Sequence, residues 1–221
     1  FSSRPAAIGL TLAAGALCND ASFQPDPETG RHSFLGDPTE GALLVAAQQA
    51  GLDKKALETL LPRVNELPFD SDRKRMTTVH RLDTAPESLP TAVRALIGTE
   101  KPYVAFTKGA VDGLLEICSR VWDGDGAVPL DESWRRRIEI ANNEMAQNGM
   151  RVLGLALRRL QTPNEPLEED LILIGLVGMI DPPRPEVKTA VATCKTAGVR
   201  PIMITGDHPL TARFIAHDLG I

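Results

Sequence analysis

Cysteine is scarce in this sequence of 221 residues, which contains three cysteines in all. Cys18, Cys118 and Cys194 are far apart and odd in number, and no CxxC pair occurs. This pattern argues against a disulfide framework and against a thiolate metal site. Such cysteine usage is typical of a protein from a reducing cytoplasm.

Long apolar runs and excess positive charge are also missing. The longest uncharged apolar run, residues 171–180, is shorter than the roughly 18 residues that a membrane-spanning helix needs. The formal net charge is −5, so no overall basic field recruits nucleic acid. No signal peptide is visible, and both Phe1 and Ile221 look like cut ends, so we expect a fragment. Hydrophobic residues make up 43% of the chain, which suffices for a packed core.

The first 180 residues have the pattern of an antiparallel sheet with interspersed helices, an α+β layout. A segment rich in Pro, Asp and Gly, residues 20–36, predicts a loop or hairpin. Asp37 and Pro38 then form a strong helix start signal, with Glu40 at the third helical position. The other predictions are helices over residues 6–17, 37–50, 53–61, 109–118 and 133–147, strands over residues 64–69, 76–82, 102–107, 151–157 and 171–180, and a surface insertion over residues 84–99.

After the Asp-Pro-Pro segment at residues 181–183 the pattern changes. Helix, strand and helix follow one another with short joints, which is typical of an α/β fold with a parallel sheet. These three elements are predicted over residues 185–197, 199–204 and 209–219. The prolines cannot continue a helix, so the segment is the best candidate for a domain joint. We therefore expect one domain over residues 1–180 and another over residues 181–221.

Three candidate functional residues, Thr205, Gly206 and Asp207, end the predicted apolar strand and precede a helix. In a parallel sheet, ligands bind at the carboxyl ends of strands, beside helix N-termini whose free N–H groups favour anions. A hydroxyl, a glycine and a carboxylate there suit a phosphoryl group and its magnesium ion. The alternative is an ordinary strand-to-helix turn that Asp207 caps. His208 follows, but without Cys or His companions it is poor evidence for a metal site.

Lys108 and Gly109 stand between a predicted strand and a predicted helix. Glycine permits the close approach of a ligand, and a lysine at this place can meet phosphate as a point charge. Most surface lysines have no such role, so the motif alone leaves both interpretations open.

Phe69 precedes a charged turn that contains Arg73, Lys74 and Arg75. An exposed Phe beside basic side chains can stack a base while the cations address phosphates. Taken alone, the motif favours the alternative, a core Phe at a strand end followed by a solvated hairpin turn. Glu40 and Arg151 also have ordinary explanations, as a capping-box residue and as a strand-edge arginine.

Taken together and in order, these motifs resemble the P-type ATPases. The matching segments are residues 17–20, 36–40, 69–76, 108–110, 151 with 153–156, 178–184 and 203–207. They look closest to the group that contains calcium pumps and sodium/potassium pumps, in a bacterial-looking form. The resemblance implies that residues 1–180 form the cytoplasmic nucleotide-binding domain. It also implies that residues 181–221 form the hinge and the start of a haloacid dehalogenase-like phosphorylation domain.

The resemblance implies a nucleotide site in the first domain. Glu40 and Phe69 would contact the adenine ring of ATP, Phe69 by stacking. Lys74, Lys108 and Gly109 would line the pocket, with Lys108 near its floor.

Further residues of the resemblance concern the phosphates and the second domain. Arg151 would approach the phosphates, and Asp181 and Arg184 would lie at the hinge, close to the γ-phosphate. The Thr-Gly-Asp motif would belong to the phosphorylation site. The Asp-Lys-Thr-Gly segment that carries the phosphorylated aspartate is absent, and so is the later segment with the magnesium-binding aspartate. Most magnesium ligands are therefore expected outside this sequence.

The family pattern often has a small residue and then arginine after the aromatic of the basic turn, whereas Asp70 and Ser71 stand here. One phosphate contact is therefore expected to be missing or replaced by Arg73. We expect the fragment to bind ATP at about a millimolar to a few tenths of that, without hydrolysing it. The expected partners are the remaining phosphorylation, actuator and membrane domains of the same polypeptide, and no nucleic acid.

The resemblance places this fragment on the cytoplasmic side of an integral membrane protein, with calcium as the expected transported ion. A sodium/potassium or proton pump is the alternative within the family. A free-standing phosphatase would need a nucleophilic aspartate at a strand end before Asp20, and none is present. An interaction domain that does not respond to nucleotide is the alternative from another class.

Overall fold

The computed structural model describes residues 5–25, 32–82, 91–94, 101–124, 126–180, 183–206 and 209–221. Its contacts divide the chain into two compact units. The first unit comprises Phe1–Glu132 and Leu153–Leu176, and the second comprises Ser133–Val152 and Val177–Ile221. The domain boundary near residue 180 stays a prediction, because Asp181 and Pro182 lie outside the described residues.

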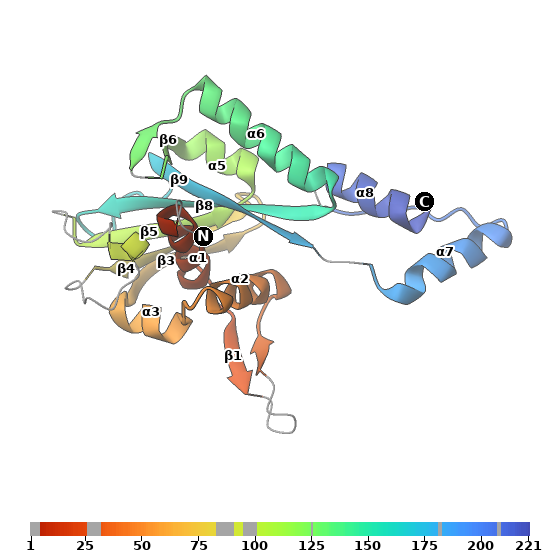
Figure 1. Ribbon diagram of the computed structural model, residues 1–221, viewed down its shortest axis with the longest axis horizontal. Helices are drawn as coiled ribbons and strands as arrows, with labels where there is room; N and C mark the ends of the chain where they lie inside the picture. Colours follow the sequence, from red (N-terminus) through yellow and green to blue (C-terminus); the bar gives the residue numbers. More distant parts are fainter. Residues whose placement is uncertain are drawn as a thin grey trace. The chain divides into compact units, whose positions relative to one another are not determined.

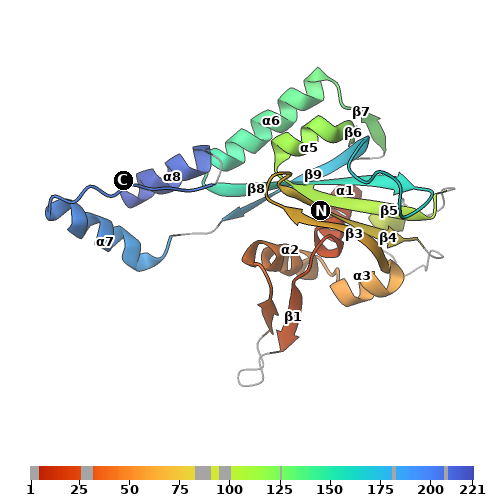
Figure 2. The same cartoon turned by 180° about the vertical axis from the view of Figure 1, so that it is seen from behind.

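The chain forms a seven-stranded sheet with the strand order β3-β4-β5-β8-β9-β6-β7 (Figures 1 and 2). The strands are β3 (Arg63–Asp70), β4 (Arg75–Arg81), β5 (Tyr103–Gly109), β6 (Cys118–Trp122), β7 (Ala127–Pro129), β8 (Met150–Leu160) and β9 (Leu171–Ile180). The pairs β3–β4, β4–β5, β5–β8 and β6–β7 are antiparallel, whereas β6 and β9 are parallel. The expectation of a purely antiparallel sheet is therefore wrong, and the sheet is mixed.

The parallel pair arises from β6, a strand that the sequence pattern does not predict. α5 (Val111–Ile117) runs directly into β6, so no turn residue marks the change from helix to strand. The connection from β6 to β9 passes through α6 (Glu132–Gln147) and β8. A connection of this length can return a strand beside its neighbour in the same direction, as parallel pairing requires.

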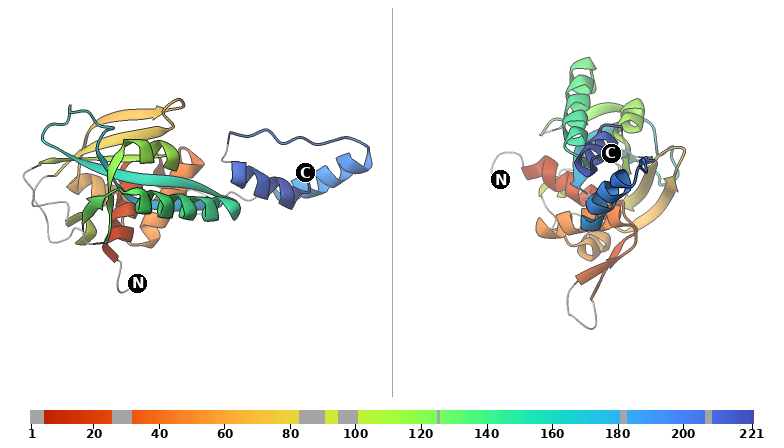
Figure 3. Two further views of the ribbon diagram at one scale, coloured as in Figure 1. Left: turned by 90° about the horizontal axis from the view of Figure 1, so that it is seen from above. Right: turned by 90° about the vertical axis from the view of Figure 1, so that its right-hand side faces the viewer.

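Helices of the first unit cover one face of the sheet (Figure 3). They are α1 (Pro5–Leu17), α2 (Pro38–Gln49), α3 (Lys54–Leu60) and the short α4 (Thr91–Arg94), and the hairpin of β1 (Ser22–Pro25) and β2 (His32–Leu35) joins α1 to α2. α1 packs against α2, α3, α4 and β5. It is apolar on all sides, as expected of a helix enclosed by other elements. Its fully buried residues include Leu10, Ala13, Ala14, Ala16 and Leu17.

These helices confirm the predictions over residues 6–17, 37–50 and 53–61, and the hairpin confirms the loop or hairpin predicted over residues 20–36. The start signal of α2 acts as expected, since Asp37 Oδ1 accepts hydrogen bonds from the backbone N–H groups of Thr39 and Glu40. Asp53 starts α3 in the same way, accepting from Ala56 N at 2.8 Å. Apart from α4, the insertion predicted over residues 84–99 lies outside the described residues.

β4 is buried on both of its faces, with five consecutive buried residues. On one face, His80 Nδ1 meets the carbonyl oxygen of Leu61 at the end of α3, at 2.8 Å. On the other face, Thr77 Oγ1 lies 2.9 Å from Thr107 Oγ1 and also donates to Glu168 of the β8–β9 loop. This strand is therefore enclosed between the end of α3 and this loop.

The second unit contains α6, α7 (Pro185–Thr196) and α8 (Pro209–Leu219), which confirm three predicted helices. Thr211 Oγ1 of α8 donates to the carbonyl oxygen of Met150 at 2.9 Å. A side chain at Gly149 would collide with the ring of Phe214, so glycine permits α8 to approach this turn. Glycines with positive φ follow α7 and α8, as expected of helix ends.

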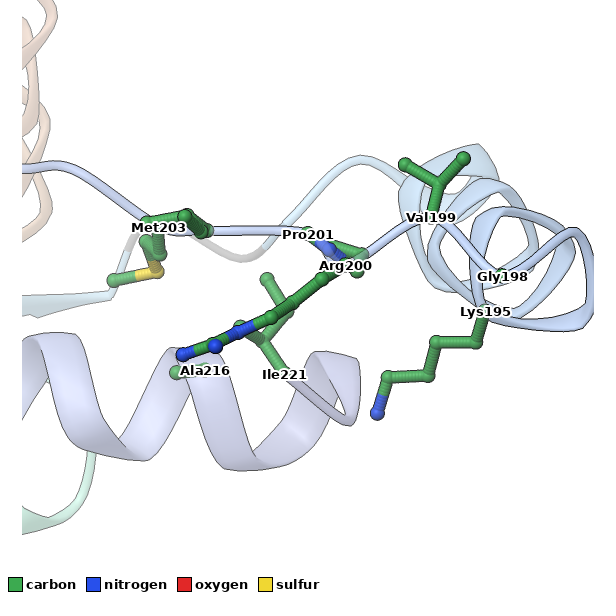
Figure 4. Close-up of a pocket in the computed structure, with 9 residues that line it drawn as sticks. Lys195, Gly198, Val199, Arg200, Pro201, Met203, Ala216 and Ile221 are labelled. Carbon is green, nitrogen blue, oxygen red and sulfur yellow. The ribbon is translucent and has the colours of Figure 1, made fainter.

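The strand predicted over residues 199–204 is wrong, because this segment has no regular secondary structure. Ile202 and Ile204 are 73% and 93% exposed. A strand needs a neighbour for its N–H and C=O groups, and in the described part of the second unit no strand pairs with this segment. It borders an open groove of about 620 Å³ with the ends of α7 and α8 (Figure 4). The haloacid dehalogenase-like sheet is therefore not confirmed.

Candidate functional site

The turn between β3 and β4, residues 71–74, carries the charged motif that follows Phe69. Asp70 Oδ1 accepts from the backbone N–H groups of Asp72 and Arg73, each at 2.9 Å. These hydrogen bonds, led by the one from Arg73, hold the pKa of the Asp70 carboxyl below its ordinary value. Lys74 N donates to Asp70 O at 2.7 Å, and Lys74 has a positive φ of 51°. Asp70, which departs from the family pattern, thus closes the turn.

Gly109 supports this turn from the neighbouring strand. Ala110 N donates to the carbonyl oxygen of Lys74 at 3.2 Å. A Cβ atom at Gly109 would lie 2.6 Å from Arg75 Cβ and 2.8 Å from Lys74 O. The sequence motif predicts glycine as a means of close approach to a ligand, whereas in the structure the group that approaches is the backbone of the turn.

Lys108 of β5 and Glu40 of α2 form an ion pair beside the C-terminal end of α1. Lys108 is 7% exposed, and its Nζ donates to Glu40 Oε1 and, at 2.7 Å, to the carbonyl oxygen of Cys18. Glu40 Oε2 accepts from the backbone N–H groups of Asp20 and Ala21, each at 3.0 Å. The Glu40 carboxylate therefore joins α2 to the end of α1 and to β5, a larger role than capping its own helix.

The end of α1 is held by a second lysine. Lys54 Nζ donates to the carbonyl oxygens of Asn19 at 2.6 Å and Ala21 at 2.7 Å. Lys54 and Lys108 thus place two positive charges at the C-terminal end of α1, where the helix dipole favours cations. Burial raises the pKa of the nearby Cys18 thiol despite the charge of Lys108, so this cysteine stays protonated at neutral pH.

Phe69 lies in an irregular part of the β3–β4 pairing, between the Leu67–Thr77 and Asp70–Arg75 pairs. It is 64% exposed, which excludes the alternative of a core phenylalanine. Met76 lies opposite this irregular part and pairs with Lys108 on β5. Neighbouring strands are about 5 Å apart, so Phe69 and Lys108 are two strands, about 10 Å, apart along the sheet. The first unit therefore brings Phe69, Lys74, Lys108, Gly109 and Glu40 into one neighbourhood.

Glu168 is a member of this neighbourhood that sequence reasoning missed. Arg73 Nη1 donates to its Oε1 at 2.5 Å, and Arg75 Nε donates to its Oε2 at 2.7 Å. Burial alone would raise the pKa of Glu168, but the hydrogen bonds from Arg73, Arg75 and Thr77 lower it below the ordinary value. The expected replacement of a phosphate contact by Arg73 stays a prediction, and this ion pair competes with it.

Lys74 is the exception in the basic triplet. Within the described ranges, its ammonium has no ion pair, and the residue is exposed. No motif in the sequence links Glu168 to the turn, since the two are more than 90 residues apart.

The remaining predicted site residues belong to the second unit or lie outside the described residues. Arg151 is exposed on β8. Arg184 is exposed and lies at the N-cap of α7. Thr205 and Gly206 are exposed in the irregular segment before α8, whereas Asp181 and Asp207 lie outside the described residues. Their roles stay predictions.

Among the residues whose placement is described, no three His, Cys, Asp or Glu side chains gather in a way that could hold a metal ion. In the same residues, no helix combines the length and the apolar character needed to cross a membrane.

Comparison with known proteins agrees with the order of the motifs. The family model of the P-type ATPase cytoplasmic domain N matches residues 8–186. The calcium-transporting ATPase 1 of Bacillus cereus is 44% identical over 215 residues, covering 96% of this chain and 22% of the relative. The calcium-transporting ATPase of Bacillus subtilis is 36% identical over 212 residues, covering 94% of this chain and 22% of the relative.

A vertebrate protein provides a third relative. The sodium/potassium-transporting ATPase subunit alpha-2 of Gallus gallus is 34% identical over 232 residues, covering 98% of this chain and 21% of the relative. The chain thus spans about a fifth of the length of the relatives it matches. Because the family model covers most of the sequence and the mixed sheet with its flanking helices agrees with it, the chain belongs to the P-type cation-transporting ATPases, and residues 8–186 correspond to cytoplasmic domain N of that family.

Proposed function

We propose that this chain is the ATP-binding cytoplasmic part of a cation-transporting ATPase. It holds ATP and presents the γ-phosphate to an aspartate outside the present sequence. The carboxylate oxygen of that aspartate would attack the γ-phosphorus while the bond to the β-phosphate oxygen breaks and ADP leaves. Water would then cleave the acyl phosphate. The remaining phosphorylation, actuator and membrane domains of the same polypeptide would couple these steps to ion transport.

The exposure of Phe69 is the observation that carries the proposal. A large aromatic ring is 64% exposed beside a turn whose backbone is fixed by hydrogen bonds from both sides. Such a ring is available to stack on adenine, and stacking on one base contributes roughly 1–3 kcal/mol. Lys74, exposed on the same turn, would address the phosphates as a point charge.

Glu40 and Lys108 would form the floor of the adenine pocket. A lysine ammonium has three N–H donors, and two of those of Lys108 are used by Cys18 and Glu40. One donor therefore remains for a ring nitrogen of the base. The Glu40 carboxylate is an acceptor that could receive the adenine amino group. Both side chains are already fixed by the protein, so binding would cost little additional ordering.

Magnesium would reach this site with the triphosphate. We expect most of the protein ligands of this ion to lie outside the present sequence. With phosphate and magnesium contacts mostly absent, we expect a Kd of about a millimolar or a few tenths of that, and no hydrolysis by this chain alone.

The names of the Bacillus relatives favour calcium as the transported ion. The Gallus relative is named as a sodium/potassium-transporting subunit, so transport of sodium and potassium is the alternative within the family. Calcium flux into vesicles that contain the whole polypeptide would decide between them. ATP-driven sodium or potassium flux without calcium flux would contradict the calcium assignment.

Titration of the chain with ATP, followed by NMR or by isothermal calorimetry, tests the nucleotide site. Phe69→Ala should weaken ATP binding about tenfold, because it removes roughly 1–3 kcal/mol of stacking. Val64→Ala is the matched control, since Val64 is another exposed apolar residue of β3, at 41% exposure. It should leave the affinity unchanged. Equal affinities for the Phe69→Ala variant and the wild type would contradict the stacking role.

The alternative from another class, a nucleotide-independent interaction domain, predicts no response to ATP in any variant. Adenosine and GTP in the same titration measure the contributions of base and phosphates. Adenosine should retain most of the affinity of ATP if Phe69 provides the main contact. No binding of any nucleotide by the wild-type chain would favour the interaction domain.

A further inference from the structure

Glu168 lies in the β8–β9 loop, and its carboxylate is almost fully enclosed by the β3–β4 turn and β4. The side chain is 10% exposed, and both oxygens accept hydrogen bonds. Arg73 Nη1 and Thr77 Oγ1 donate to Oε1 at 2.5 and 3.0 Å, and Arg75 Nε donates to Oε2 at 2.7 Å. A buried carboxylate with two guanidinium partners is strongly fixed, and so are its partners.

The contacts of the two arginines extend to the backbone of the turn. Arg73 Nη2 donates to the carbonyl oxygen of Pro68, the residue before Phe69, at 2.9 Å. Arg75 Nη1 donates to the carbonyl oxygen of Arg73 at 3.4 Å. A continuous set of hydrogen bonds therefore runs from Glu168 through Arg73 to the peptide that carries Phe69.

Glu168 acts from the face of the sheet opposite Lys108. Arg75 and Thr77 alternate along β4 with Met76, and Met76 pairs with Lys108. Side chains of consecutive strand residues point to opposite faces, so Glu168 and the Glu40–Lys108 pair hold the same strands from two sides. The carboxylate of Glu168 is thus placed to fix the turn without touching a ligand bound over Lys108.

We infer that Glu168 is a positioning residue of the nucleotide site, which holds Arg73 and Arg75 and thereby fixes Phe69 and Lys74 for binding. The inference rests on the proposed function of this site. In this interpretation Arg73 and Arg75 bind Glu168 and stabilise the turn, whereas Lys74 is the residue of the basic triplet that contacts the phosphates. The order of the turn, and with it the affinity for nucleotide, depends on a residue of a distant loop.

The experiment is an ATP titration of the 221-residue chain carrying Glu168→Gln. The amide keeps the volume but loses the charge that binds two guanidinium groups. We expect ATP affinity to fall about three- to tenfold and exchange of the Lys74 amide, bonded to Asp70 O, to accelerate. Glu169→Gln is the matched control, because Glu169 is the next residue of the loop and pairs with Arg158. It should change neither quantity.

A double-mutant cycle separates positioning from a general loss of stability. Because part of its effect passes through Phe69, Glu168→Gln should reduce affinity less in a Phe69→Ala background than in the wild type. Independent, additive losses in the cycle, or wild-type affinity in Glu168→Gln, would overturn the inference while Phe69 keeps its role. Thermal unfolding of each variant shows that the titrated protein is folded. Absence of ATP binding by the wild-type chain would overturn the proposed function, and this inference with it.

Discussion

His80 is a buried, neutral histidine near the C-terminal end of β4. It is fully buried, its ring lies 5.8 Å from that of Phe106, and its Nδ1 meets the carbonyl oxygen of Leu61 at 2.8 Å. A carbonyl only accepts, so Nδ1 carries the proton and Nε2 accepts from the Thr78 hydroxyl at 3.0 Å. Burial lowers the pKa of His80 to about 4, with help from the nearby charges of Arg63 and Lys54.

This lowered pKa predicts that the free energy of unfolding decreases as the pH falls below neutrality. Between about 4, the folded pKa, and about 6.5, the ordinary value, the unfolded chain binds more protons at this site than the folded one. The stabilising contribution of His80 is therefore complete above pH about 6.5 and falls as the pH drops through this window. Over the whole window the loss amounts to roughly 3 kcal/mol.

Urea unfolding at several pH values across this window measures the effect. His80→Asn is the comparison, because an amide N–H can still donate to Leu61 while it does not titrate. The free energy of unfolding of His80→Asn should depend less steeply on pH than that of the wild type between pH about 4 and about 6.5. Carboxylates with lowered pKa values, such as Glu168, titrate in both proteins and cancel in the difference. Parallel pH curves would contradict the assignment.

At the scale of secondary-structure elements, the Lys108–Glu40 pair joins three of them. Lys108 belongs to β5, Glu40 to the first turn of α2, and the carbonyl oxygen of Cys18 to the end of α1. Side-chain exposures of 9% for Lys108 and 13% for Glu40 mean that neither charge can regain water if its partner is removed. Losing one member of a buried pair costs about 3–5 kcal/mol.

Lys108→Met should therefore destabilise the chain by about 3–5 kcal/mol, because Glu40 keeps a buried charge without its cation. The double variant Glu40→Gln with Lys108→Met should lose less than the sum of the two single variants. Chemical unfolding of the four proteins measures the coupling. Additive losses would mean that the pair contributes no mutual stabilisation. For the same reason, a loss of ATP binding in Lys108 variants needs a folding control, whereas Phe69→Ala does not perturb a buried contact.

Most helices and strands could be predicted from the sequence because residues at their ends mark where they begin and end. Asp37 and Asp53 start helices by hydrogen bonds within three residues, and the glycines after α7 and α8 have the positive φ that ends a helix. β6 has no such signal, since its first residue follows α5 directly. Its parallel partner, β9, is distant in the sequence, so no local pattern predicts that the two strands pair.

At the scale of the whole molecule, the candidate site is only partly predictable for a similar reason. Phe69, Lys74, Lys108 and Glu40 lie on short motifs whose order in the chain indicates the family. Glu168 has no motif, and it meets Arg73 and Arg75 only because the β8–β9 loop folds over the end of β4. Contacts of this kind depend on tertiary packing, so only a structure could identify the partner of the basic turn.

Residues 199–204 show how strand formation depends on neighbours that local sequence does not provide. The segment is apolar enough to predict a strand, yet Ile202 and Ile204 are 73% and 93% exposed and the described part of the chain gives it no strand to pair with.

Backbone amides without hydrogen-bonded partners exchange rapidly with solvent, whereas amides of paired strands are protected. The amides of Ile202, Met203 and Ile204 should therefore exchange at close to unprotected rates in this chain, while those of Thr77 and Phe106 exchange slowly. In a longer chain that supplies neighbouring strands of a parallel sheet, the same three amides should become protected. Hydrogen–deuterium exchange followed by mass spectrometry or NMR measures both states, and strong protection of residues 202–204 in the 221-residue chain would contradict the irregular conformation.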